Sequence, residues 1–175
     1  MRQIARGAFF VSLLFILSVS IFTQNSRGPS TPEERATAVR GAHLLESDPF
    51  NPEAKKIRQW FTLWLIQIPD ITVQMCTDYL RPVYEAKDKN YSTEIAIQMT
   101  FSSAAFIIEH PDQASDKIAV NLAGLEGSLK AYESVLKVKP KAKSEFLDGL
   151  IAKREKGELK AYVEEVAKTK CKGKS

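Results

Sequence analysis

The stretch that decides the fold is Ser92–Glu109, S-T-E-I-A-I-Q-M-T-F-S-S-A-A-F-I-I-E. Ser92 suits the N-cap of a helix that we expect from about Thr93 to Glu109. Apolar side chains lie on nearly every face of this helix, which is typical of a central, buried helix. The small residues at 102–105 would allow a neighbouring helix to approach closely. The sequence therefore predicts an all-α fold built around this segment.

A second long helix is predicted from about Gln113 to Lys137, after His110-Pro111 ends the first. Its apolar residues are spaced alternately by four and three: Ile118, Leu122, Leu125, Leu129, Tyr132 and Leu136. This spacing is that of knobs-into-holes packing between helices. Gly124 and Gly127 weaken the helix, so we expect them where another backbone comes close.

Two helices are predicted before the central one. Thr31 and Glu34 form a capping-box pattern for a helix that begins at Pro32 and runs to about Ser47. Asn51 is expected to cap a second helix, with Pro52 at its first position. Its apolar stripe consists of Ile57, Trp60, Phe61, Trp64, Leu65 and Ile68. Core packing is the favoured interpretation of this stripe, and a ligand-stacking platform of the two tryptophans is the alternative.

Pro69 should end the second helix, and Asp70 is expected to cap another that runs from Ile71 to about Val83, its end disturbed by Arg81-Pro82. The alternating residues 71–75 would also fit a short strand, but no second strand is predicted to pair with it. A sixth helix around 146–151 and a seventh around 159–166 complete the pattern. We expect about seven helices in a single compact helical bundle or helical-hairpin array over residues 31–167.

Residues 1–22 have the pattern of a signal peptide. Arg2 and Arg6 precede the apolar run 8–22, and Ser18-Val19-Ser20 fits cleavage after Ser20. An uncleaved anchor is the alternative, although 15 helical residues span only about 22 Å of a hydrocarbon core of about 30 Å. We expect a linker at 23–30, a basic tail at 168–175, and an exported protein, periplasmic or extracellular, that is anchored to the inner membrane if the run is retained.

The sequence contains two cysteines, Cys76 and Cys171. In an exported protein two cysteines most simply form a disulfide, so we predict this bond. The alternative is a reactive thiol at Cys171, because Lys170 and Lys172 would favour its thiolate.

The net charge of +4 is uneven: residues 139–175 contain 11 Lys and Arg against 6 Asp and Glu. A solvated helix face and tail explain this excess most simply. Membrane contact is expected only through the N-terminal segment or the basic tail. Nucleic-acid binding is not expected, because RNP-like, zinc-finger and helix-turn-helix patterns are missing.

No pattern in the sequence indicates catalytic, cofactor-binding or metal-binding residues, so we expect no cofactor. The histidines are His43 and His110, too few and too isolated for a metal cluster. Ser102 and Ser103 lack a base nearby in the sequence. An enzyme would therefore need a site assembled only by the fold, for example a pocket that gathers Glu109, His110 and another polar group.

Parts of the sequence resemble known families. The turn L-E-S-D-P-F-N-P-E-A at 45–54 resembles the turn that joins tetratricopeptide repeats, with a fainter copy at 136–142. Pro49 and Pro140 are 91 residues apart, which is not a multiple of that repeat's period. The segments 32–36, 64–70 and 102–111 resemble a family of uncharacterised exported bacterial helical proteins. That resemblance implies an envelope or extracellular setting and assigns no activity.

These patterns favour an exported helical binding or interaction module of the bacterial envelope, with an envelope protein as its expected partner. The alternatives are a small secreted or periplasmic enzyme with a site assembled only in the fold, and a membrane-anchored helical domain.

Overall fold

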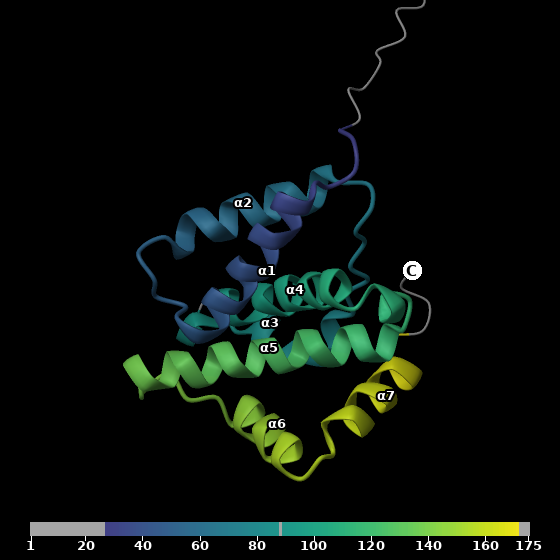
Figure 1. The fold of residues 1–175 in the computed structure, drawn as a ribbon. Helices are drawn as coiled ribbons and strands as arrows, with labels where there is room; N and C mark the ends of the chain where they lie inside the picture. Colours follow the sequence, from purple (N-terminus) through teal and green to yellow (C-terminus); the bar gives the residue numbers. More distant parts are fainter. Residues whose placement is uncertain (1–26, 88, 172–175) are drawn as a thin grey trace, which may run out of the picture.

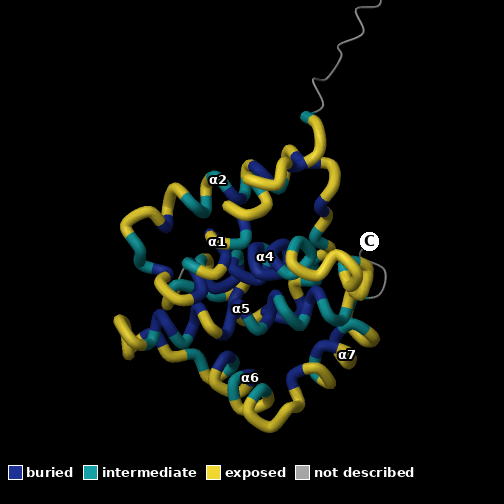
Figure 2. Tube along the Cα trace, viewed as in Figure 1, coloured by how far each residue is buried: buried dark blue, intermediate teal, exposed yellow. Residues whose placement is uncertain are grey.

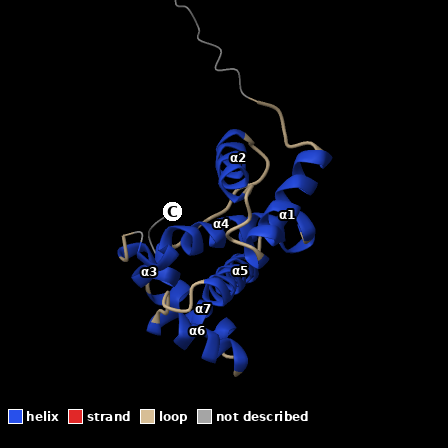
Figure 3. Cartoon of the chain, turned by 90° about the vertical axis from the view of Figure 1, so that its left-hand side faces the viewer, coloured by secondary structure: helices blue, strands red, loops and turns tan. Residues whose placement is uncertain are grey.

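The computed structural model describes residues 27–87 and 89–171. Within them the chain forms seven α-helices, three 3₁₀ helices and no strand (Figure 3), which confirms the all-α prediction. The α-helices are α1 (Pro32–Ser47), α2 (Ala54–Gln67), α3 (Arg81–Glu85), α4 (Ser92–Glu109), α5 (Lys117–Val138), α6 (Glu145–Glu155) and α7 (Leu159–Thr169). The 3₁₀ helices are η1 (Thr77–Leu80), η2 (Lys89–Tyr91) and η3 (Pro111–Gln113).

Three predicted segments lie wholly or partly outside these residues. The predicted signal peptide at 1–22 is outside them, as are residues 23–26 of the predicted linker. Of the predicted basic tail, 172–175 lie outside, and α7 continues to Thr169.

The central position predicted for the 92–109 helix is confirmed. In Figure 1, α4 and α5 lie side by side, with α1 and α2 on one side and α6 and α7 on the other. Figure 2 shows buried residues concentrated along α4 and α5. From α4, Phe101 and Ala104 belong to an apolar cluster shared with α1 and α2, whereas Ile95 and Met99 belong to a second cluster with α5, α6 and α7. The molecule therefore has two apolar cores, and α4 contributes to both.

The helices α4 and α5 approach closely, as the small residues predict. A Cβ at Gly124 would lie 2.7 Å from the carbonyl oxygen of Met99, and one at Gly127 would overlap the Ser102 hydroxyl. The Ser103 hydroxyl donates a hydrogen bond across the interface to the carbonyl of Val120, at 3.1 Å. Glycine on one helix and serine on the other thus bring the two backbones together.

Capping of α1 follows the prediction, because Thr31 and Glu34 form a complete capping box. The predicted cap of α2 was wrong. The Asn51 side chain accepts a hydrogen bond from the Glu53 amide at 3.0 Å, which makes a local turn, and the helix begins only at Ala54.

The predicted starts of α4 and α5 also differ from the structure. Ser92 is the first residue of α4 and makes no capping bond; the N-cap is Tyr91, in the left-handed conformation with φ 62°. The helix α5 begins at Lys117 rather than Gln113, because the Asp116 carboxylate accepts hydrogen bonds from the amides of residues 118 and 119. Residues 111–113 form η3 instead.

The helix predicted from Ile71 to Val83 was wrong. Residues 71–76 are not helical, and η1 and α3 follow them, with Pro82 in the first turn of α3. Ile71 and Val73 pack into the cluster of α1 and α2, whereas Met75 packs into the other cluster. Alternation along an extended segment sends every second side chain inward, so one segment links both cores without pairing as a strand.

Asp70 does not cap a helix after α2. Its carboxylate accepts hydrogen bonds from the Ser30 amide at 2.8 Å, the Ser30 hydroxyl at 2.7 Å and the Arg35 guanidinium at 2.6 Å. Burial raises the pKa of this carboxyl, but these donors outweigh it and lower the pKa to about 2. Asp70 thus attaches the residues before α1 to the end of α2.

A disulfide joins Cys76 and Cys171, as the sequence predicts, with their Cα atoms 5.8 Å apart. Cys76 precedes η1 and Cys171 follows α7, so the bond connects segments 95 residues apart. Both cysteines of the sequence are therefore paired, which overturns the alternative of a reactive Cys171 thiol. Disulfides of this kind are typical of oxidising compartments.

Candidate functional site

A groove with a volume of about 480 Å³ opens on the surface between α1 and α2. Its apolar walls come from Leu44 on α1 and from Ile57 and Trp60 on α2. Gly41 also lines it, and a Cβ there would lie 3.0 Å from the Ile57 Cγ2, so the two helices touch at this point. A mainly apolar concave surface of this size is typical of a ligand-binding site.

Aromatic packing holds α2 and orients the tryptophan of the groove. The ring of Trp60 is stacked on that of Trp64, with centroids 5.5 Å apart and an interplanar angle of 14°. Phe61 stacks on Phe101 of α4 at 4.3 Å. Phe61 and Trp64 are buried, which confirms core packing for this part of the stripe, whereas Trp60 is half-buried and lines the groove.

The groove also has a positively charged rim. Arg40 from α1 donates a hydrogen bond to the Thr37 hydroxyl at 3.1 Å and forms no ion pair among the described residues. Lys56 from α2 pairs with Glu53 at 2.9 Å, and both side chains are well exposed. Because an exposed ion pair contributes little, Lys56 remains available to another anion. Apolar walls and two cations together suit an anionic amphipathic ligand.

A buried polar network lies where α1 crosses α4 and α5. Glu46, 6% exposed, accepts hydrogen bonds from the Ser102 hydroxyl at 2.7 Å and from the Lys130 ammonium at 3.3 Å. The Gln98 amide donates to the Ser102 hydroxyl at 2.9 Å and to the Ala42 carbonyl at 3.0 Å. A buried carboxylate that has such donors stabilises the arrangement of the helices around it.

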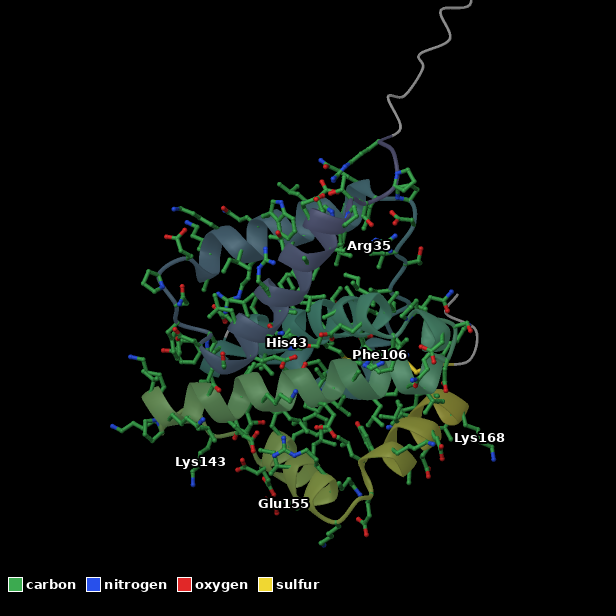
Figure 4. The ribbon with its side chains drawn as sticks, in the orientation of Figure 1. Arg35, His43, Phe106, Lys143, Glu155 and Lys168 are labelled. Atoms are coloured by element: carbon green, nitrogen blue, oxygen red, sulfur yellow. A yellow bond between two sulfur atoms is a disulfide. The ribbon has the colours of Figure 1, made fainter. Side chains whose placement is uncertain are left out.

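His43 extends this network toward the surface (Figure 4). Its Nδ1 lies 3.4 Å from a Glu46 carboxylate oxygen, and its Nε2 lies 3.1 Å from one of Glu109. Partial burial lowers the pKa of His43, but the hydrogen bonds to Glu109 and Glu46 outweigh it and raise the pKa above the usual value. The His43 imidazole thus lies between a carboxylate of α1 and a carboxylate of α4.

The geometry of this network suits packing rather than nucleophilic catalysis. The Ser102 side chain is hydrogen-bonded to Glu46 and Gln98, and only 5% of the residue is exposed. Gly127 packs against the same hydroxyl so closely that no Cβ fits. A nucleophilic hydroxyl needs a base and access for the substrate. Ser102 has a carboxylate beside it, but its burial leaves a substrate no access to the hydroxyl.

The sequence suggested Glu109 and His110 as parts of one assembled site, but in the structure their side chains contact different residues. Glu109 contacts His43, whereas the His110 ring packs against Phe106 with centroids 4.6 Å apart. Sequence reasoning missed the contact between Glu46 and Ser102. The available signal was a polar pair four residues apart, Gln98 and Ser102, on a mainly apolar helix.

Residues 27–87 and 89–171 contain neither a metal cluster nor a membrane-spanning helix. No group of three or more His, Cys, Asp or Glu side chains in this part of the chain could hold a metal ion. No helix there combines the length and apolar character needed to cross a membrane.

The groove and the polar network are thus the two arrangements on which a functional assignment can rest. Comparison of the chain with protein-family models, with curated proteins and with solved structures finds no match.

Proposed function

We propose that this protein is an exported helical binding module of the bacterial envelope, with the groove between α1 and α2 as its binding site. The observation that carries the proposal is the groove itself, in which apolar walls lie beside the cations Arg40 and Lys56. Export is supported by the signal-like segment 1–22 and by the disulfide. The bacterial setting rests on the resemblance to uncharacterised exported bacterial proteins.

The occupant inferred for the groove is an anionic amphipathic envelope component. Its apolar part would displace water from Leu44, Ile57 and Trp60. Its anionic group would lie at Arg40 and Lys56, where charge-assisted hydrogen bonds are stronger than neutral ones. The same chemistry could be presented by an acidic, apolar segment of an envelope protein or by a single-chain lipid.

The test uses anilinonaphthalene sulfonate, a fluorescent probe that is apolar and anionic, together with dodecanoate as a competitor. The double variant Arg40→Gln/Lys56→Gln should bind the probe about tenfold more weakly than the wild type, because two cations are lost. The control is Lys55→Gln/Lys143→Gln, which removes two exposed charges that do not line the groove. Dodecanoate should displace the probe from the wild type.

Equal affinities in the two double variants would contradict the assignment of the groove. Displacement of the probe by an acidic, apolar peptide but not by dodecanoate would identify a protein as the source of the ligand. No saturable binding of either competitor would overturn the proposed function.

A further inference from the structure

The face of α2 that points away from the core is exposed and carries two large apolar side chains. Leu63 is 58% exposed and Ile66 is 75% exposed, and residues three apart on a helix are neighbours. The rest of this face consists of Lys55, Lys56, Gln59 and Gln67, all of them exposed. We call these six residues the outer face of α2.

The charges of α2 have one sign only. The helix contains Lys55, Lys56 and Arg58 and no acidic residue. Arg58 is turned inward and donates a hydrogen bond to the Pro49 carbonyl at 2.9 Å. Lys56 pairs with Glu53, whereas Lys55 forms no ion pair among the described residues. Lys55 lies in the first turn, where the helix dipole disfavours cations, so helix stability does not explain its position. Contact with an anionic surface outside the domain would explain this placement.

The chain enters the domain beside this face. The Arg27 guanidinium donates a hydrogen bond to the side-chain oxygen of Gln67, at 3.4 Å, next to Ile66. In Figure 1 the described chain starts at the α1 and α2 end of the molecule, opposite α6 and α7. Only residues 23–26 separate Arg27 from the apolar run 8–22. Four residues span at most about 14 Å, so a run held in a bilayer keeps the outer face close to that bilayer.

We propose that the outer face of α2 docks on an anionic membrane surface. Leu63 and Ile66 enter the boundary between headgroups and acyl chains, and Lys55 lies against the lipid phosphates. Two apolar side chains alone give a weak contact. Where the apolar run 8–22 is retained in the bilayer, the short tether raises their effective concentration at the surface. A membrane also fits the two-residue apolar patch better than a protein partner, which would need a larger buried area.

The docking can be tested on the full chain reconstituted in vesicles of phosphatidylcholine, with and without one quarter phosphatidylglycerol. A Leu63→Trp variant should be quenched by acyl-brominated lipid beyond the background of the native tryptophans, and more strongly with phosphatidylglycerol. Val138→Trp is the matched control, because Val138 is 57% exposed at the end of α5. Equal quenching at the two positions, or quenching that does not increase with phosphatidylglycerol, would overturn the proposal.

A second measurement does not depend on the N-terminal segment. The protein recovered from the exported fraction is floated with the same vesicles, and Lys55→Gln should weaken binding about fivefold. Lys56 is left unchanged because it lines the groove. The control Lys139→Gln removes one exposed charge from the basic C-terminal region. A larger loss in the control would assign membrane contact to that region, and a fraction that does not float at all would overturn the proposal. Neither readout involves the groove, so the proposed function is tested separately.

Discussion

Gly127 lies where three helices meet without room for a side chain. A Cβ there would overlap the Ser102 hydroxyl and lie 2.7 Å from a carboxylate oxygen of Glu46. Gly127→Ala should therefore lower the free energy of unfolding by about 2 kcal/mol, even though alanine favours the helix by up to about 1 kcal/mol. Urea unfolding followed by circular dichroism measures this loss.

Gly149 provides the matched control for this substitution. It lies inside α6, and a Cβ there would have no atom within 4 Å. Gly149→Ala should raise the free energy of unfolding by up to about 1 kcal/mol, because only the helix propensity changes. Similar effects at the two glycines would show that the contact between α1, α4 and α5 is looser than described.

Asp70 makes stability depend on pH in the acid range. Its pKa is about 2 in the folded protein, below the ordinary value of 3.8 that an unfolded chain would show. Since the folded value is the lower one, the carboxylate contributes its full stabilisation above about pH 5 and loses it as the pH falls toward 2. The urea midpoint of Asp70→Asn should be below that of the wild type at pH 7, and the difference should narrow between about pH 4 and pH 2. A difference that is constant with pH would contradict this role of the Ser30 and Arg35 donors.

Individual residues were predictable from the sequence where their chemistry is local or unique. Two cysteines in a chain with a signal-like segment have one simple pairing, and glycines in a regular apolar repeat indicate close approach. Glu46 was not predictable, because its partners Ser102 and Lys130 come from distant helices. Nothing in the sequence near Glu46 distinguishes it from an exposed helix carboxylate.

Among the elements, α2 packs on α4 through an aromatic contact. Phe61 is fully buried and stacks on Phe101, so Phe61→Ala should lower the free energy of unfolding by about 3–5 kcal/mol. Leu63 on the same helix is 58% exposed, and Leu63→Ala should change it by less than about 0.5 kcal/mol. Chemical denaturation of both variants provides the comparison. Losses of similar size would mean that the two faces of α2 are not distinguished as the structure shows.

The long periodic helices were predictable from the sequence, but the residues at which they begin and end were not. The start of α5 depends on Asp116, whose capping role competes with the helix signals of the residues before it. Residues 71–75 alternate, and the alternation correctly indicates extended chain even though no strand forms in the described residues. The missing strand partner led to a helix prediction, whereas the segment is extended because it connects two cores. The groove was not predictable either, because the spacing of Trp60 is that of a core residue.

For the molecule as a whole, the disulfide encloses all of one core but only the α4 part of the other. Every buried residue of the cluster shared by α3 to α7 lies between Cys76 and Cys171. The cluster of α1 and α2 depends on residues before Cys76, which dock on α4 without a covalent link of their own. The sequence alone does not show which residues belong to which core, because that depends on how the helices pack.

This arrangement predicts an unequal response to loss of the disulfide. Cys76→Ala/Cys171→Ala should lower the free energy of unfolding by about 2–5 kcal/mol. Hydrogen exchange measured by mass spectrometry should accelerate more in α5 and α7 than in α1 and α2, because α1 and α2 exchange through local undocking that the ring does not restrain. Uniform acceleration over all helices would show that the two cores unfold as one unit.

The spacing of the two cysteines also has a consequence for the biogenesis of the protein. They lie 95 residues apart, and a ribosome adds about 5–20 residues per second, so Cys76 is made roughly 5–20 s before Cys171. During this interval the thiol of Cys76 has no partner within its own chain, and any disulfide it forms must later be exchanged. The native disulfide can therefore form only after α7 has been synthesised. A nascent chain that stalls earlier keeps Cys76 without its native partner.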